Sequence, residues 1–395
     1  MGLDKALKPV RLAGLSLRNR IIKTATFEGM CPEGIPGEDL IGHHTAIAAG
    51  GAGMTTVAYC GVSPDGLTFS DQMYMHEGIA PQVRALTAAV HQQGGAVSAQ
   101  LAHCGGFSRN RPRTSRRPLG PHFGINQYGL FSGLPFSGAM TQRDIDRTVR
   151  EYGEAAAFVK RQGFDAAEIH MGHGYLLSQF ISPATNRRRD AYGGSLDKRM
   201  RLPVEVLASV RQAVGDDFPV LAKLNLGDGF KGGVTTADAV AAARLLAREG
   251  VDAIVMSGGF VSRSPMYLFR GDSPLPYMIP LEPNPVQRLA MKLLGVSLFR
   301  SDPFRELYFL EEARQVRQAV DIPLVYLGGV SSAAAIEQAM DEGFDFVAMG
   351  RALIEDPNMI RRLAADPDLR SACIHCNRCV ATMSTPRGVH CVLHP

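Results

Sequence analysis

The chain has 395 residues, of which 45% are hydrophobic and 20% are charged, so it can bury a full core. Its 42 basic and 38 acidic side chains leave a net charge of +4, which is too small to indicate a nucleic-acid-binding protein. No apolar run reaches the roughly 18 residues of a membrane span. The N-terminal segment lacks the apolar core of a signal peptide, and Ala6 breaks the myristoylation pattern. We therefore expect a cytoplasmic protein that binds neither nucleic acid nor membrane.

Short apolar runs recur along the chain, and each is followed by a longer segment with helical spacing of its apolar residues. The runs predict eight strands, at residues 20–26, 54–61, 96–102, 166–171, 220–226, 253–259, 324–330 and 346–352. The helical patterns include residues 81–93, 141–162, 202–214, 236–250, 303–320 and 333–343. Eight alternating units predict a parallel sheet closed into a TIM (β/α)8 barrel. A doubly wound open sheet is the alternative, but no GxGxxG motif follows an early strand.

Two long segments interrupt this alternation, after the third and the sixth strands. Residues 104–140 are rich in Gly, Pro and Arg, and residues 260–302 include SRSPMYLFRG. Because both leave from the carboxyl ends of strands, we expect them over the active face as lids or pocket walls. Apolar side chains of the second segment either line a substrate pocket or pack it onto the barrel, namely Met266, Tyr267, Phe269, Tyr277 and Met278. We assign residues 1–365 to the barrel and 366–395 to a cysteine-rich extension packed on it.

The predicted strand at residues 166–171 ends in a group of hydrogen-bonding side chains. His170, His173 and Tyr175 all lie between residues 170 and 175. Chemistry in parallel α/β proteins is placed at the carboxyl ends of strands. Two imidazoles and a phenol at such a position can bind a carbonyl or nitro oxygen and supply a proton. The alternative is that these residues cap backbone carbonyls and pack, but three of them at one strand end favour a catalytic site.

Glycines follow the last two predicted strands. Gly328 and Gly329 lie in LGGV, and Gly350 and Arg351 lie in MGRALIEDP. Glycine lets backbone N–H groups approach a phosphate closely, and the N-terminus of the next helix adds a favourable dipole. Arg351 can add a charge-assisted hydrogen bond. Since barrels commonly hold phosphate after strands seven and eight, these residues predict a phosphate site.

Two polar residues near strand ends, Gln100 and Lys223, need an explanation because the barrel mouth should be apolar. Gln100 suits the pyrimidine edge of a flavin, and Lys223 can stabilise negative charge at N1 and O2 of a reduced flavin. The alternative for Lys223 is a barrel-wall ion pair with Glu168 or Asp228.

Five segments lie in the order and spacing of a known family: RNRIIKTAT, SAQLAH, EIHMGHGYLLSQFISPATNRRRDAYGGSLDKR, LGGV and MGRALIEDP. They resemble the signatures of the old yellow enzyme family of FMN-dependent oxidoreductases, and the resemblance covers nearly the whole chain. It implies that FMN is held by Thr24, Ala25, Thr26, Cys60, Gln100, Lys223, Gly328, Gly329, Gly350 and Arg351. It further implies that His170 and His173 bind the electron-withdrawing oxygen of the substrate, and that Tyr175 delivers a proton.

The resemblance also implies a ping-pong reaction, in which NAD(P)H reduces FMN and the reduced flavin then reduces the substrate. Flavin N5 would pass a hydride to the β-carbon of an activated alkene while Tyr175 protonates the α-carbon. Three features depart from the family pattern, one of them the sequence HCGG at residues 103–106, where relatives carry an HAGR-like element. Lys223 stands where many relatives carry Arg. Lysine keeps the positive charge but lacks the two parallel N–H donors of a guanidinium group. Phe27 stands where relatives carry a Thr or Cys, so we expect noncovalent FMN with an altered potential.

Four of the seven cysteines crowd the C-terminal end, namely Cys373, Cys376, Cys379 and Cys391. In a reducing cytosol such a group indicates a metal site more than disulfides. Four thiolates suit either a [4Fe–4S] cluster or a zinc ion. Their spacing resembles the cluster site of 2,4-dienoyl-CoA reductase and trimethylamine dehydrogenase, which favours iron–sulfur over zinc. In those relatives the cluster relays electrons to a further domain, and here we expect a partner protein to take that role.

The main hypothesis is an FMN-dependent, NAD(P)H-driven reductase of activated alkenes or related small electrophiles, expected to be a homo-oligomer. One alternative is an amine or alcohol dehydrogenase, or a demethylase, that runs the flavin in the opposite direction. A second alternative is a noncatalytic redox or metal sensor that uses the cysteines. The physiological substrate and the choice between NADH and NADPH do not follow from the sequence.

Overall fold

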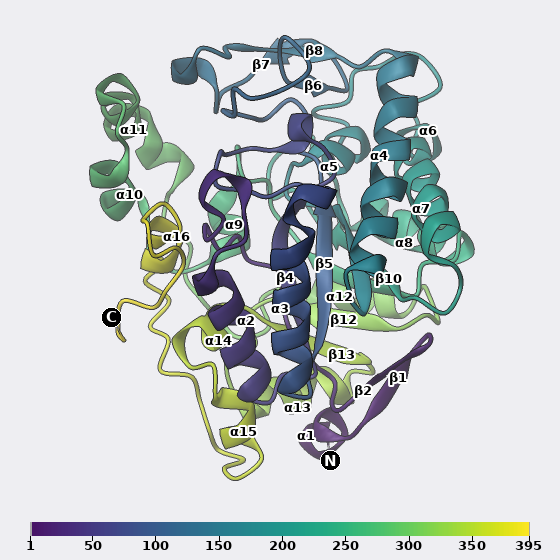
Figure 1. The fold of residues 1–395 in the computed structure, drawn as a ribbon, viewed down its shortest axis with the longest axis vertical. Coiled ribbons are helices and arrows are strands. Elements are labelled where there is room, and N and C mark those ends of the chain that lie inside the picture. Colours follow the sequence, from purple (N-terminus) through teal and green to yellow (C-terminus); the bar gives the residue numbers. More distant parts are fainter. Residues whose placement is uncertain (1, 395) are drawn as a thin grey trace.

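The chain forms a closed barrel of eight parallel strands in a computed structural model that describes residues 2–394. Helices surround this barrel (Figure 1). All eight predicted strands are present, as β3 (Ile21–Lys23), β4 (Met54–Gly61), β5 (Ala96–Ala102), β9 (Ala166–Met171), β10 (Val220–Asn225), β11 (Ala253–Ser257), β12 (Leu324–Leu327) and β13 (Phe346–Met349). Neighbouring strands follow the order of the chain around the barrel. The prediction of a TIM barrel is confirmed, and the open-sheet alternative is wrong.

Helices cover the outer face of the barrel, so nearly every strand residue is buried on both sides. The predicted helices are present as α3 (Ala80–Gln92), α4 (Gln142–Arg161), α7 (Arg201–Val214), α8 (Thr236–Arg248), α12 (Leu310–Arg317) and α13 (Ala333–Asp341). Helix α12 starts later than predicted because residues 304–309 turn over the barrel mouth, where Phe304 and Tyr308 line a pocket. Helix α2 (Glu38–Ala49) was not predicted, because its buried face includes the polar residue His44.

Three aspartates tie the barrel together at the amino ends of its strands. Each aspartate lies directly before one strand, and its carboxylate accepts a hydrogen bond from a backbone N–H at or near the start of the adjacent strand. The same carboxylate also pairs with a basic side chain on the helix that precedes this adjacent strand. The three sets are Asp165 with Val97 and His91, Asp252 with Val220 and Arg211, and Asp345 with Leu324 and Arg317. The same arrangement therefore links β5 to β9, β10 to β11 and β12 to β13.

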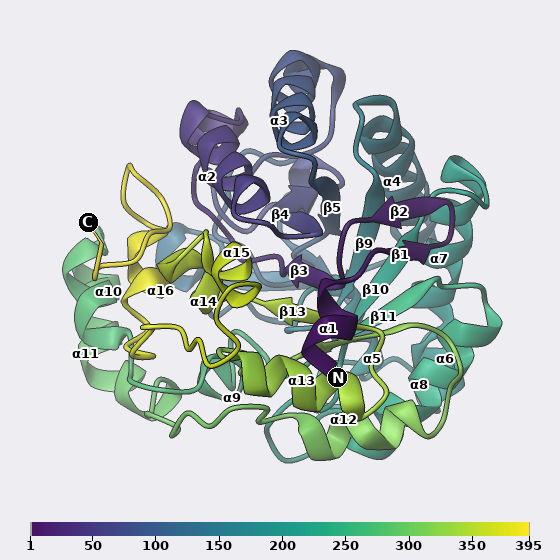
Figure 2. The same ribbon diagram turned by 90° about the horizontal axis from the view of Figure 1, so that it is seen from below.

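The N-terminal segment closes this same end of the barrel, as Figure 2 shows from below. It consists of α1 (Gly2–Leu7) and an antiparallel hairpin of β1 (Val10–Leu12) and β2 (Leu15–Leu17). Leu12 and Leu17 of the hairpin are almost fully buried and pack with residues of the barrel strands, including Ile22 and Leu221. The hairpin therefore seals the barrel interior at the amino ends of the strands.

Both long segments that leave the carboxyl ends of strands contain secondary structure of their own. The first holds a three-stranded sheet of β6 (Leu119–Gly120), β7 (Gly124–Ile125) and β8 (Phe136–Ala139), which Figure 1 shows at the end of the molecule remote from the N-terminus. The second holds α9 (Pro265–Phe269), α10 (Leu275–Leu281) and α11 (Pro285–Leu298). Helix α10 contacts α16 (Arg378–Thr382) of the cysteine-rich tail. None of the helices formed by residues 2–394 combines the length and apolar character needed to cross a bilayer.

We predict that Asp252→Asn destabilises the barrel, because the amide leaves Arg211 without its anion and weakens the bond to the Val220 N–H. The free energy of unfolding should fall by roughly 2 kcal/mol, the typical worth of a charge-assisted hydrogen bond. Urea denaturation followed by circular dichroism measures this change. Asp216→Asn is the matched control, since Asp216 is exposed in the loop before β10. Equal stability of the two variants would contradict the role given to Asp252.

Candidate functional site

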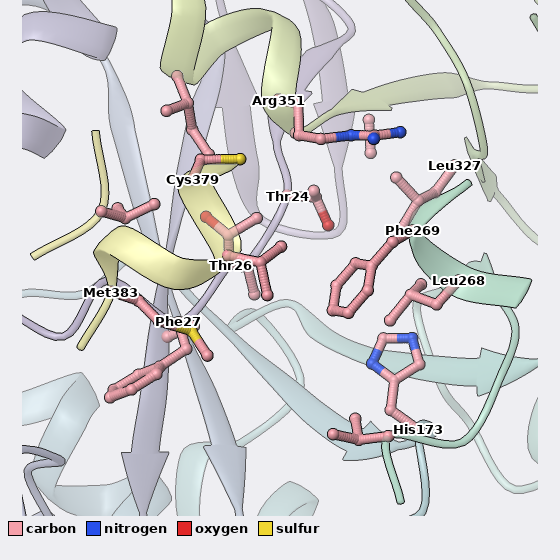
Figure 3. Close-up of a pocket in the computed structure, with 18 of the residues that line it drawn as sticks. Thr24, Thr26, Phe27, His173, Leu268, Phe269, Leu327, Arg351, Cys379 and Met383 are labelled. Atoms are coloured by element: carbon pink, nitrogen blue, oxygen red, sulfur yellow. The ribbon is translucent and has the colours of Figure 1, made fainter. Parts of the chain in front are cut away.

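A cavity of about 230 Å³ opens at the carboxyl ends of the strands, and we call it the barrel-mouth pocket. It brings together most of the residues predicted from the sequence, namely Thr24, Ala25, Thr26, Gln100, His170, His173, Tyr175, Lys223, Gly329, Gly350 and Arg351. Figure 3 shows Arg351 and His173 toward opposite ends of the drawn side chains. The pocket therefore has a predicted phosphate end and a predicted catalytic end.

The catalytic end holds His170 in contact with both His173 and Tyr175. The ring centre of His170 lies 4.9 Å from the ring centre of His173 and 4.8 Å from that of Tyr175. His170 lies in β9, so its position is set by the strand ladder, and its Nδ1 faces the Gly172 N–H at 3.4 Å. That bond makes Nε2 the protonated nitrogen of His170, a donor for a ligand. His173 Nε2 lies 2.7 Å from the hydroxyl of Ser257.

Burial keeps this group uncharged at neutral pH. Burial lowers the pKa of His170 well below its usual range, with smaller contributions from His173 and the Lys223 ammonium. Burial, helped by Lys223, lowers the pKa of His173 to about 3. Burial also raises the pKa of the Tyr175 phenol above its usual value. The site thus presents neutral imidazoles and a protonated phenol, which are hydrogen-bond donors and a proton source rather than charges.

Beneath this group, Lys223 forms a buried ion pair with Glu168. The ammonium lies 2.8 Å from Glu168 Oε1, and the two side chains are 1% and 3% exposed. Lys223 also donates to Thr24 Oγ1 at 3.1 Å, while Gln100 Nε2 donates to Glu168 Oε1 at 2.7 Å. The barrel-wall ion pair that the sequence left open is present, yet Lys223 and Gln100 still line the pocket. The two readings of Lys223 are therefore compatible.

A second buried lysine, Lys23, was missed by the sequence analysis. Its ammonium donates to the Thr24 carbonyl at 2.8 Å and to Thr26 Oγ1 at 2.7 Å, so it supports the wall opposite Lys223. Burial lowers its pKa and raises that of the fully buried Glu28, whose carboxylate accepts the Ala58 N–H at 3.2 Å. A charged residue that directly follows Ile21 and Ile22 in a predicted barrel strand is the signal that could have identified Lys23.

At the phosphate end, Arg351 is held by the tail and by the second long segment. Its Nη1 donates to the Arg270 carbonyl at 2.8 Å and to Asn377 Oδ1 at 2.5 Å. Asn377 is buried, has a left-handed backbone and donates in turn to the carbonyls of Arg270 and Asp272. His375 stacks on Phe304 at 3.4 Å between ring centres, and both line the pocket. The tail therefore forms part of the pocket wall, which the sequence did not indicate.

Two predicted flavin residues do not line the pocket. Cys60 is fully buried in the core, because the ladder between β4 and β5 shifts register between Val57 and Cys60 and leaves Ala58 and Tyr59 on the pocket side. Gly328 lies just outside, although its neighbour Gly329 is a lining residue. Cys60 therefore does not line this pocket, and its assignment to the cofactor stays a prediction.

Both long segments contribute walls to the pocket, as predicted. Phe107 and Tyr128 come from the first segment, and Val261, Leu268 and Phe269 come from the second. Of the five apolar residues considered for the second segment, only Phe269 lines the pocket. Met266 is buried, Tyr267 packs against Phe309, and Tyr277 stacks against Arg378 of the tail. For most of this group the packing interpretation is correct.

The four tail cysteines line one small cavity, which we call the cysteine cavity. It shares Cys379, Arg351 and Ile354 with the barrel-mouth pocket. Figure 3 shows Cys379 and Arg351 among the side chains of that pocket. Within residues 2–394, no three Cys, His, Asp or Glu side chains are close enough together to bind one metal ion as they stand. The cysteines are nonetheless gathered, and one of them faces both cavities.

Sequence comparison matches two family models to this chain. The first, described as the NADH:flavin oxidoreductase / NADH oxidase family, matches residues 5–262. The second, described as dihydrouridine synthase, matches residues 305–383, which include β12 and β13. Together the two matches cover both the catalytic and the phosphate ends of the pocket.

Three similar proteins illustrate the range of relatives. The 4,4'-dithiodibutanoate disulfide reductase of Rhodococcus erythropolis is 41% identical over 98% of this chain and 94% of its own length. The metal reductase of Desulforamulus reducens is 29% identical over 98% of this chain but only 53% of its own length. A structure of 2-naphthoyl-CoA reductase with 2-naphthoyl-CoA superposes with a TM-score of 0.81 at 21% identity, over 98% of this chain and 56% of the other. The chain thus spans about half the length of several relatives, and the last likeness concerns the fold alone.

We predict that Lys223→Met destabilises the protein and lowers its flavin content. The substitution leaves the Glu168 carboxylate buried without a counter-ion, which costs about 3–5 kcal/mol. The double variant Lys223→Met/Glu168→Gln removes both charges and should recover most of the stability but not the flavin. Urea unfolding and the flavin absorbance of the purified variants measure the two effects. A single variant as stable as the wild type would show that the pair is not structural.

Proposed function

The chain belongs to the NADH:flavin oxidoreductase / NADH oxidase family, and from this premise we propose that it reduces a small electrophile at His170, His173 and Tyr175. It is an FMN-dependent oxidoreductase that uses NAD(P)H. The observation that carries the proposal is that the neutral imidazole of His170 contacts both the neutral imidazole of His173 and the protonated phenol of Tyr175 at one end of the barrel-mouth pocket. Such a set suits an electrophile that gains negative charge during reduction.

The residues of the pocket fit a flavin. Bound FMN supplies hydride transfer from its reduced form to the electrophile. Gln100 of β5 and Lys223 of β10 line the pocket from either side of β9 and can bind the polar edge of the flavin ring, with Thr24 and Thr26 also lining the pocket. Gly329, Gly350 and Arg351 can bind the phosphate, because two glycines allow close backbone approach and Arg351 is already oriented by Asn377. Every residue that would make these contacts lines the pocket.

The catalytic residues divide the work on an activated alkene. His170 and His173 donate hydrogen bonds to the carbonyl or nitro oxygen, which becomes more negative as the β-carbon gains a hydride. Tyr175 then transfers its phenolic proton to the α-carbon, so that one hydride and one proton complete the saturated product. A raised phenol pKa keeps Tyr175 protonated until that step.

A disulfide is a second candidate substrate, favoured by the reductase that is 41% identical over nearly the full length of both chains. Reduction of a disulfide requires two electrons and two protons and yields two thiols. Hydride from a bound reduced flavin would form one S–H bond and release the other sulfur as a thiolate, which Tyr175 can protonate. The apolar walls formed by Phe107, Leu268 and Phe269 suit either kind of substrate.

Two other functions remain as alternatives. An amine dehydrogenase or demethylase would use the same flavin in the oxidative direction, but an amine presents a cation and gains little from two imidazole donors beside Lys223. A noncatalytic sensor would leave the contacts of Tyr175 without a purpose. Steady-state assays with cyclohexenone and with simple amines separate the reductase from the dehydrogenase. If the protein turns over no enone, no amine and no disulfide, the sensor is favoured.

We further propose that residues 366–395 form a cysteine-rich extension of the barrel that holds a [4Fe–4S] cluster through Cys373, Cys376, Cys379 and Cys391. Zinc is the lesser alternative, because four thiolates satisfy either metal centre. The support is that all four side chains line the cysteine cavity and that Cys379 also lines the barrel-mouth pocket. A cluster at this place would connect the flavin to an electron-transfer partner protein.

We predict that Tyr175→Phe slows substrate reduction by about 10²–10⁴-fold, the usual contribution of a general acid. Flavin reduction by NAD(P)H should stay nearly unchanged, since that step does not use the phenol. Anaerobic stopped-flow absorbance measures the two half-reactions separately with cyclohexenone as the electrophile. An equal loss in both half-reactions would mean that Tyr175 positions the flavin and is not the acid.

We predict that anaerobically purified protein contains about four irons and four sulfides per chain, the content of one [4Fe–4S] cluster. Cys379→Ser should lose most of this iron, whereas Cys31→Ala should keep it, because Cys31 lies in the core away from the cysteine cavity. Metal and sulfide analysis with an absorption spectrum gives the result. About one zinc per chain without iron would select a zinc site made by the four thiolates, and protein without either metal would contradict both assignments.

A further inference from the structure

A second cavity, of about 410 Å³, lies outside the barrel-mouth pocket, and we call it the outer cavity. Its walls come from three parts of the chain that are far apart in sequence. The first long segment contributes Phe107 and residues 120–127, the loop after α5 (Leu176–Ile181) contributes Thr185 and Arg187, and the second long segment contributes Arg263. No residue of this cavity belongs to the predicted flavin site.

The outer cavity adjoins the catalytic end of the pocket. Phe107 lines both cavities, and the outer-cavity residue Gly174 stands between His173 and Tyr175 in the chain. The Val261 N–H donates to the His173 carbonyl at 3.0 Å, which fixes the segment carrying Arg263 beside the catalytic histidine. A molecule that reaches from one cavity into the other would therefore have one end at the reacting site.

Three basic side chains line the outer cavity without an acidic partner. No Asp or Glu is among its lining residues, and within residues 2–394 neither Arg187 nor Arg263 has a carboxylate at ion-pair distance or a hydrogen-bond acceptor for its guanidinium. Arg263 is instead held over the rings of Phe230 and Phe260, at 5.2 and 5.9 Å. His122 Nδ1 is buried and also lacks a partner among the described residues.

The two guanidinium groups lie close enough to repel each other and to disfavour a proton on His122. Burial lowers the pKa of Arg263, and Arg187 lowers it further, against a smaller opposing effect of Asp228. Burial likewise lowers the pKa of His122, where the Thr185 backbone opposes the shift and both arginines add to it. Guanidinium groups bind carboxylate and phosphate oxygens through paired hydrogen bonds. A bound anion would relieve the repulsion and supply the acceptors that the two guanidinium groups lack.

We propose that the outer cavity is an anion subsite, in which Arg187, Arg263 and His122 bind a carboxylate or phosphate of the molecule whose reactive end lies at His170 and His173. This inference rests on the proposed function, which places the reacting atoms at those histidines. It deepens that function by naming the substrate class, a small electrophile that carries an anionic group several atoms away from the bond reduced. The same chemistry would serve a phosphate of the reductant NAD(P)H.

Paired ligands test the proposal without turnover. One is 3-(4-hydroxyphenyl)propanoate, whose phenol oxygen suits the two histidines and whose carboxylate is the anion that the proposal places in the outer cavity. The other is its uncharged amide. Isothermal titration calorimetry on the FMN-loaded protein should give about tenfold or more tighter binding of the acid, the worth of one charge-assisted hydrogen bond. Arg187→Gln/Arg263→Gln should bring the two dissociation constants together by weakening the acid alone.

Arg189→Gln is the matched control, because Arg189 is an exposed neighbour of Arg187 that does not line the outer cavity. It should keep the preference for the acid. Whether the outer cavity binds a phosphate of the reductant is tested by measuring the anaerobic reduction of bound FMN at increasing concentrations of NADH and NADPH. The subsite is assigned to the reductant if two results occur together. The wild-type protein binds the acid and the amide equally well, and the double variant binds NAD(P)H more weakly than the wild type does.

The proposal is overturned if the double variant leaves both the acid preference and NAD(P)H binding unchanged, or if Arg189→Gln has the same effect as the double variant. Failure of the proposed function gives a different result, in which neither phenol binds to the wild-type protein. The anion subsite is then decided by the NAD(P)H measurement alone.

Discussion

The ion pair between Lys223 and Glu168 is the constraint on which the candidate site depends. An ammonium enclosed in a barrel mouth requires an anion beside it, and Glu168 meets this need from the neighbouring strand β9. The same carboxylate accepts from Gln100 of β5, so three adjacent strands are joined at one level. His170 follows Glu168 by two positions on the same face of β9 and is the register partner of Lys223, which places its imidazole beside the pair. The chemistry of the mouth is thus set by the register of three strands.

Much of the fold followed from the sequence because strands and helices alternate with clear punctuation. All eight strands were predicted, since buried parallel strands appear as short continuous apolar runs. Helix α2 was missed because His44 occupies one of its buried positions, and α12 was predicted too long because the chain bends at Phe304 to enclose the pocket. Both errors arise where tertiary contacts override local pattern.

The site was predictable where one short segment carries several functional groups, as at His170, His173 and Tyr175. It was less predictable where distant segments meet. Nothing local in the tail indicates that Asn377 holds Arg351, and a register shift within β4 removes Cys60 from the pocket although its sequence position suggested contact. Lys23 could have been identified by the reasoning applied to Lys223, because both are charged residues in apolar strands.

The two ends of the barrel differ in what they contribute. The three aspartate links and the N-terminal hairpin lie at the amino ends of the strands, whereas the barrel-mouth pocket and the outer cavity lie at the carboxyl ends. Substitutions in the two long segments therefore change what the enzyme accepts while leaving intact the bonds that hold the barrel closed. For laboratory evolution of new substrate ranges, residues 107–128 and 261–269 are the natural place to diversify, with the opposite end of the barrel kept as a constant scaffold.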